Sequence, residues 1–153
     1  MKNVVVTTDN LLQIDKRDIH RLIFLLSKEL GFEISELAVN FVDRKTILSI
    51  NKTHLKHNYT TDIITFGYNE TLENLEAEIF ISYVDAAENA RRYRVPLEKE
   101  IARLVIHGIL HLIGYDDKKE KDKILMKKLE NKLVSRYSMV VKNPVNFNDI
   151  KNS

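Results

Sequence analysis

The 153-residue sequence contains no cysteine, and this absence removes several kinds of chemistry at once. Without thiols the chain cannot form disulfides, bind zinc through thiolates or use a cysteine nucleophile. A chain without cysteine also fits a reducing compartment, so we expect a cytoplasmic location. The remaining composition, 44% apolar and 30% charged residues, is that of an ordinary soluble domain. The length predicts one domain over residues 1–141, and residues 142–153 form a polar C-terminal tail.

Long hydrophobic runs are absent too. The apolar run near the N-terminus, Val4–Val6, is too short for a signal peptide, and no segment approaches the length that spans a membrane. We therefore expect no membrane partner. The formal net charge of +2 is too small to indicate a nucleic-acid partner by itself.

Alternating and helical patterns of apolar residues follow one another along the chain. β-branched and alternating runs predict strands over residues 4–8, 37–42, 61–66 and 77–82, and the last two are expected to form a hairpin. Helical spacing predicts helices that end near residues 30, 51 and 95, and two longer helices over residues 97–113 and 118–137. The N-caps of the first three are expected at Asp15 or Asp18, at Asp43, and at Ser82 or Asp85.

The predicted helix over residues 97–113 is apolar on nearly all sides near its C-terminal half, as expected of a helix in the centre of a domain. It carries two histidines four residues apart, at the start of the run HGILHLIGYDD (residues 107–117). Two imidazoles at this spacing share a helix face, with Cβ atoms about 5–6 Å apart, and can bind one ion. Gly114 is expected to end the helix and turn Asp116 or Asp117 toward them. The spacing predicts a divalent-metal site with an open position for water.

The spacing H-x-x-x-H-x-x-G-x-x-D is similar to the long zinc motif of metzincin proteases, H-E-x-x-H-x-x-G-x-x-H. Those enzymes place a glutamate general base directly after the first histidine, where this chain has Gly108. Glycine has no proton acceptor, so peptide hydrolysis by that mechanism is not expected. A metal that lowers the pKa of its water to about 7 suits phosphodiester hydrolysis instead.

A purely structural interpretation of these residues stays open. His107 and His111 can be hydrogen-bonded core histidines, and Asp117 can cap the last helix, because residues 117–120 (DKKE) match a capping box. Capping and metal binding are compatible, since a carboxylate has two oxygens.

The last predicted helix has an apolar side and a basic side. The positions expected to face inward are Ile124, Leu125, Leu129, Leu133 and Tyr137. From residue 117 to residue 137 the chain has eight Lys or Arg and four Asp or Glu. The basic side is either an ordinary solvated face or a surface that attracts phosphate next to the metal site.

The run HGILHLIGYDD closely resembles the signature of the YbeY family of bacterial endoribonucleases, H-G-x-L-H-L-x-G-Y-D-H, and differs at the last fixed position. Two upstream segments resemble further family motifs in the same order. Residues 50–53 (INKT) with 61–66 (TDIITF) are similar to L-N-x-x-Y-R … P-T-D-V-L-S-F, and residues 77–82 (AEIFIS) are similar to L-G-D-I-x-I-S.

The resemblance implies a single α+β domain. Its small mixed four-stranded sheet would be packed by about five helices, with a metal site at the end of the central helix. The metal, usually Zn²⁺, would be held by His107, His111 and Asp117, the last at a position where the family usually has histidine. An aspartate oxygen is a competent zinc ligand, but its negative charge leaves the site less positive and changes the metal preference.

The resemblance also implies a single-strand-specific metal-dependent endoribonuclease. Family members are associated with maturation of the 3′ end of small-subunit (16S) rRNA and with ribosome quality control, so the implied partners are single-stranded RNA, rRNA and the small ribosomal subunit. His107, His111 and Asp117 would act in catalysis through the metal-bound water, and Asp116 is a candidate for proton transfer. His54 and Leu55 replace the family's Tyr-Arg pair.

Lys56 or His57, from the loop that follows, is expected to contact the RNA phosphate in place of that arginine. Two other functions stay open. One is a ribosome assembly factor with a structural metal, and the other is a metallohydrolase of peptides or small molecules.

Overall fold

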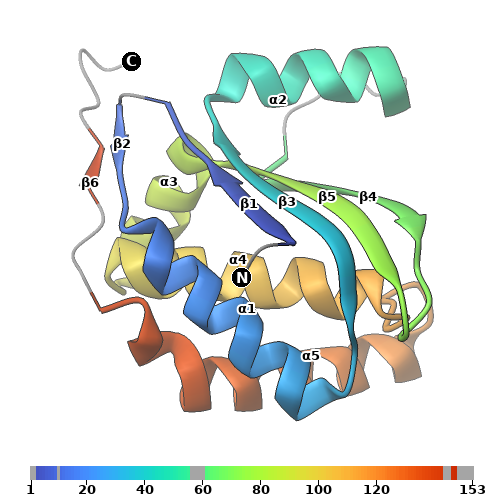
Figure 1. Cartoon of the computed structure of the whole chain (residues 1–153). Coiled ribbons are helices and arrows are strands. Elements are labelled where there is room, and N and C mark those ends of the chain that lie inside the picture. Colours follow the sequence, from blue (N-terminus) through green and yellow to red (C-terminus); the bar gives the residue numbers. More distant parts are fainter. Residues whose placement is uncertain (1–2, 10, 56–60, 143–145, 148–153) are drawn as a thin grey trace.

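A four-stranded mixed sheet lies between the helices of the molecule (Figure 1). The computed structural model describes residues 3–9, 11–55, 61–142 and 146–147. The strand order is β1 (Val4–Thr7), β3 (Ile34–Val42), β5 (Leu75–Ser82) and β4 (Ile63–Asn69). Strands β1, β3 and β5 are parallel, and β4 is antiparallel to β5. The mixed sheet and the hairpin expected from the sequence are confirmed.

Five α-helices pack around this sheet in the described part of the chain. They are α1 (Lys16–Leu30), α2 (Arg44–Ile50), α3 (Tyr83–Tyr93), α4 (Leu97–Leu112) and α5 (Glu120–Tyr137). Figure 1 shows α1 and α4 on one side of the sheet and α2 on the other. The α+β architecture with about five helices is confirmed.

Four shorter elements complete the described part of the chain. They are strands β2 (Leu12–Gln13) and β6 (Asn146–Phe147), the π-helical turn η1 (Asn51–Leu55) and the 3-10 turn η2 (Ser138–Val140). Strand β6 lies within the predicted tail and pairs antiparallel with β2, while the domain boundary after residue 141 stays a prediction. Within the described ranges, no helix has the length and apolar character that crossing a membrane requires.

Side-chain caps start three of the helices at the positions that the sequence indicates. Asp15 accepts a hydrogen bond from the Arg17 amide, Asp43 from the Thr46 amide and Ser82 from the Asp85 amide. Each cap satisfies a backbone donor that the first helical turn leaves unpaired. These contacts span two or three residues, which is why local sequence is sufficient to predict them.

Helix α4 lies in the core and packs against β4 and β5. Gly108 sits at this contact: a Cβ added there would lie 3.0 Å from Cδ1 of Ile63 and 3.2 Å from Cδ1 of Ile79. The position at which a metzincin carries its general base therefore faces the sheet in this fold. After Leu112 the helix ends, and Gly114 takes the left-handed φ of 114° that turns the chain toward α5.

The inward side of α5 differs from the prediction over its first half. Ile124 and Leu125 are 61% and 55% exposed, whereas Met126 and Glu130 are buried. Leu129, Leu133 and Tyr137 contact the core as expected. The prediction was wrong because it followed apolar residues only, and a buried glutamate occupies the inward side.

The predicted cap of α5 is also wrong. The helix begins at Glu120 with Lys119 as its N-cap, and no side chain caps it. The capping box at residues 117–120 does not form, and Asp117 lies two residues before the cap. The carboxylate of Asp117 is thus available for other contacts.

Replacing Gly108 with valine is expected to destabilise the protein. The added side chain would overpack the contact with Ile63 and Ile79, which costs about 1–3 kcal/mol. Chemical denaturation of this variant, with the exposed α5 change Lys128→Val as control, measures the difference. Equal unfolding free energies for the two variants would contradict a close approach of α4 to the sheet.

Candidate active site

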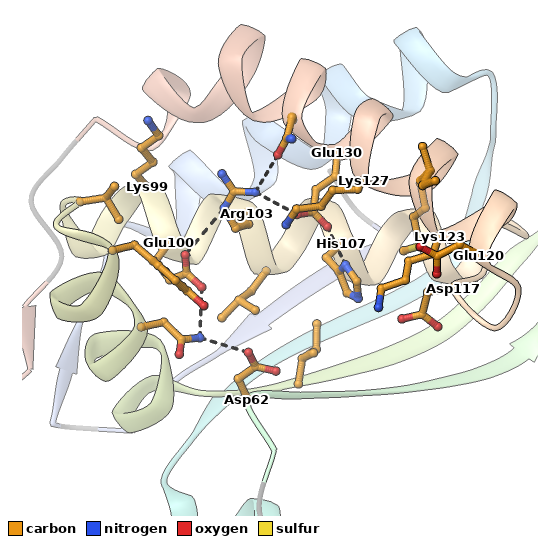
Figure 2. A pocket seen from close by; sticks show the side chains of 18 residues that line it. Asp62, Lys99, Glu100, Arg103, His107, Asp117, Glu120, Lys123, Lys127 and Glu130 are labelled. Atoms are coloured by element: carbon orange, nitrogen blue, oxygen red, sulfur yellow. Dashed lines mark hydrogen bonds and ion pairs between the residues drawn. The ribbon is translucent and has the colours of Figure 1, made fainter.

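A cavity of about 700 Å³ opens between the start of β4 and helices α3, α4 and α5 (Figure 2). Its charged lining includes Asp62, Glu100, Arg103, His107, Asp117 and Glu130. Glu100, Arg103 and His107 come from successive turns of α4, because residues three or four apart share one helix face. The cavity therefore runs along the helix that the sequence analysis placed at the centre.

His107 contacts α5 through one ring nitrogen. Its Nδ1 lies 2.6 Å from Oε1 of Glu130, and its side chain is 37% exposed. The hydrogen bond to Glu130 raises the pKa of His107 above its usual value of 6.5, against the opposing effect of burial. The nearby charges of Asp62 and Asp117 raise this pKa further.

Glu130 is the buried partner in this contact, with a side chain only 4% exposed. Its Oε2 accepts hydrogen bonds from Nη1 of Arg103 at 2.9 Å and from Nζ of Lys127 at 3.3 Å. Burial alone would raise the pKa of Glu130, but the hydrogen bond from His107 and the positive charges around it lower this pKa to about 2. The carboxylate is thus ionised in a site with little solvent.

Sequence reasoning did not select Glu130. Its position on α5 could have indicated its burial. Glu130 lies four residues after Met126, three before Leu133 and four before Val134, and these three residues are all buried. A glutamate among such positions indicates a buried partner, since an unpaired carboxylate is costly to bury.

A second set of contacts lies at the other end of the cavity. Nδ2 of Asn89 donates to Oδ2 of Asp62 at 3.1 Å and to Oε2 of Glu100 at 3.2 Å, which joins β4 to α4 through α3. Burial raises the pKa of Glu100 above its usual value, although Asn89 and Arg103 act in the opposite direction. Asp62 belongs to one of the segments that resemble the YbeY motifs.

The structure brings together part of the predicted metal site. His107 and Asp117 line the same cavity, whereas His111 is exposed and does not line it. No three His, Asp or Glu side chains in the described ranges lie in position to share one ion. The donors nevertheless have suitable chemistry, because two imidazoles at i and i+4 and a carboxylate are ligand types that zinc takes. The three-ligand site stays a prediction that requires His111 to turn toward the cavity.

The remaining predicted residues are those expected to bind phosphate or to transfer a proton. Lys56 and His57, the expected phosphate contacts, lie outside the described residues. Asp116, the candidate for proton transfer, accepts a hydrogen bond from the Lys118 amide at 3.2 Å, in the turn before α5. Lys123 and Lys127 from the basic side of α5 do line the cavity, so part of that side faces the candidate site.

The low pKa of Glu130 predicts a specific acid sensitivity. Its folded value of about 2 lies below the usual 4.5, so the unfolded chain binds the proton more readily and stability falls as pH drops through this range. Relative to Glu130→Gln, the parent is expected to lose about 3 kcal/mol of unfolding free energy as the pH falls from the usual pKa of 4.5 to the folded value of about 2. Urea unfolding of both proteins at a series of pH values measures it. A pH-independent difference would contradict an ionised Glu130.

Comparison with known proteins identifies the relatives of the chain. The family model described as "Endoribonuclease YbeY" matches residues 6–138. A Karelsulcia muelleri protein named "Endoribonuclease YbeY" is 42% identical over 110 residues, which cover 72% of this chain and 77% of that protein. A protein of the same name from Bacteroides fragilis is 37% identical over 122 residues, which cover 80% and 87% of the two chains.

A solved structure has a similar fold. The solution structure of TM1509 from Thermotoga maritima matches with a TM-score of 0.62 and 27% sequence identity, over 88% of each chain. The match of the family model to most of the sequence and the identity to curated relatives agree with the motifs at residues 107–117. This chain belongs to the YbeY family.

Proposed function

We propose that the protein is a metal-dependent endoribonuclease that cleaves single-stranded RNA and acts in maturation of the 3′ end of 16S rRNA and in ribosome quality control. The observation that supports the proposed reaction is family membership, because the matching family model is described as an endoribonuclease. Ribosomal RNA and the small ribosomal subunit are the proposed partners, and a cytoplasmic location follows from them.

Three residues would hold the ion. His107 and Asp117 already line the cavity, and His111 lies one helical turn beyond His107. We propose Zn²⁺ from the donor set of two imidazoles and one carboxylate. When bound, such an ion supplies a nucleophilic water near neutral pH and stabilises charge on a phosphoryl oxygen.

The basic residues of α5 would bind the substrate. Lys123 and Lys127 line the cavity, and the Lys127 side chain is 63% exposed although its amine also contacts Glu130. Lysines at the rim attract the phosphates of an RNA strand and orient it across the site. Lys56 and His57, which precede β4 in the sequence and lie outside the described residues, are proposed to add a phosphate contact.

Variants at Asp117 test the third ligand. Asp117→Ala is expected to lose bound zinc and to cleave single-stranded RNA at least about a hundredfold more slowly, since loss of a ligand exceeds the 10–100-fold effect of an outer contact. Asp117→His, which restores the family's usual residue, is expected to keep both metal and cleavage. Elemental analysis and a cleavage assay on the purified proteins provide the two measurements.

The matched control is Asp122→Asn, which changes an aspartate of α5 that does not line the cavity. It is expected to keep its metal and its cleavage rate. Retention of both by Asp117→Ala would refute the ligand assignment, and cleavage by a metal-free parent protein would refute the metal-dependent reaction.

A further inference from the structure

Glu130 occupies an unusual position for a charged residue. Asp18, Glu100 and Glu130 are the acidic side chains buried in the described part of the chain. Glu130 differs from the other two because it contacts one of the predicted metal ligands, across the interface between α4 and α5. A buried carboxylate at this point of a helix interface requires an explanation beyond packing.

The two oxygens of Glu130 have separate partners. Oε1 faces Nδ1 of His107 at 2.6 Å, while Oε2 accepts from Arg103 at 2.9 Å and from Lys127 at 3.3 Å. Arg103 is itself held by Oδ1 of Asn131 at 3.2 Å and lies 3.8 Å from Oε1 of Glu100. These contacts from α4 and α5 orient the carboxylate with Oε1 toward the ring of His107.

The identity of the acceptor determines which ring nitrogen carries the proton. Oε2 of Glu130 already accepts from two cations, Arg103 and Lys127, so the carboxylate accepts at Oε1 as well and Nδ1 is the donor in the contact with His107. A neutral histidine with the proton on Nδ1 has its lone pair on Nε2. Because Glu130 occupies Nδ1 and His107 lines the cavity, Nε2 is the ring nitrogen that remains for a ligand there.

We propose that Glu130 is a positioning residue: held by Arg103 and Lys127, it fixes His107 as the Nδ1–H tautomer and presents Nε2 to a divalent cation in the cavity. This role rests on the proposed metal-dependent function. An outer carboxylate of this kind orients the imidazole and increases its basicity, and its loss typically weakens metal binding by 10–100-fold.

The tautomer of the unmodified protein is the primary test. Nitrogen-15 NMR of the histidine rings, recorded without metal at a pH where the ring is neutral, distinguishes the two tautomers. His107→Gln identifies the resonances of His107. We expect the proton on Nδ1 of His107, and a proton on Nε2 would overturn the proposal. This measurement needs no variant of Glu130 and no metal.

Glu130→Gln then separates positioning from packing. The amide keeps the size of the side chain but is a weaker acceptor and can also donate, so His107 is expected to become a mixture of both tautomers. Zinc titration should show binding 10–100-fold weaker than in the parent. Asp122→Asn, which removes one negative charge from the same helix, is expected to keep both the tautomer and the parent affinity.

The outcomes distinguish this proposal from the proposed function. A parent protein with the Nδ1–H tautomer that binds no zinc would refute the metal-dependent function and leave the fixed tautomer established. A folded Glu130→Gln variant with parental tautomer and parental zinc affinity would overturn the positioning role, even if the parent is an active ribonuclease. An equal loss of affinity in Asp122→Asn would also overturn it, because the effect would then come from net charge.

Discussion

A short hydrogen bond between His107 and Glu130 joins the two helices that form the candidate site. The contact lies between α4 and α5, and it places an ionised carboxylate among the buried apolar side chains of α5, Met126, Leu133 and Val134. Burial of such a charge is favourable only when its partners compensate for lost hydration. Arg103 and Lys127 supply that compensation, so the chemistry of the cavity and the packing of the helices depend on the same residues.

The sheet sets the other boundary of the site. Gly108 lets α4 approach β4 and β5 closely, and His107, the preceding residue of the helix, lines the cavity. Asp62, the residue before β4, contacts Asn89 of α3 at the same cavity. A glycine beside the first histidine is therefore explained by packing.

Local signals in the sequence predicted most of the fold. Asp15, Asp43 and Ser82 cap their helices through contacts two or three residues away, and β-branched runs form the expected strands. Apolar spacing predicted Leu129, Leu133 and Tyr137 on the buried side of α5. It could not predict that Glu130 pairs with His107, because this partner lies 23 residues earlier in the chain. Pairing between distant charged residues depends on how helices pack, and spacing within one helix does not encode it.

The residues of the candidate site were likewise predicted only in part. Histidine spacing on one helix placed His107 and His111 on α4, and the cavity brings Asp117 near His107. Glu130 and Arg103 required the folded structure, since neither belongs to the motif at residues 107–117.

The central claim is that Nε2 of His107 is a metal ligand because Glu130 holds Nδ1. Anomalous diffraction at the zinc edge, from crystals of the full chain grown with zinc, tests it directly. We expect a single strong peak in the cavity about 2.0–2.1 Å from Nε2 of His107, with Glu130 still bound to Nδ1. A peak on Nδ1, or a peak elsewhere with His107 unliganded, would contradict it.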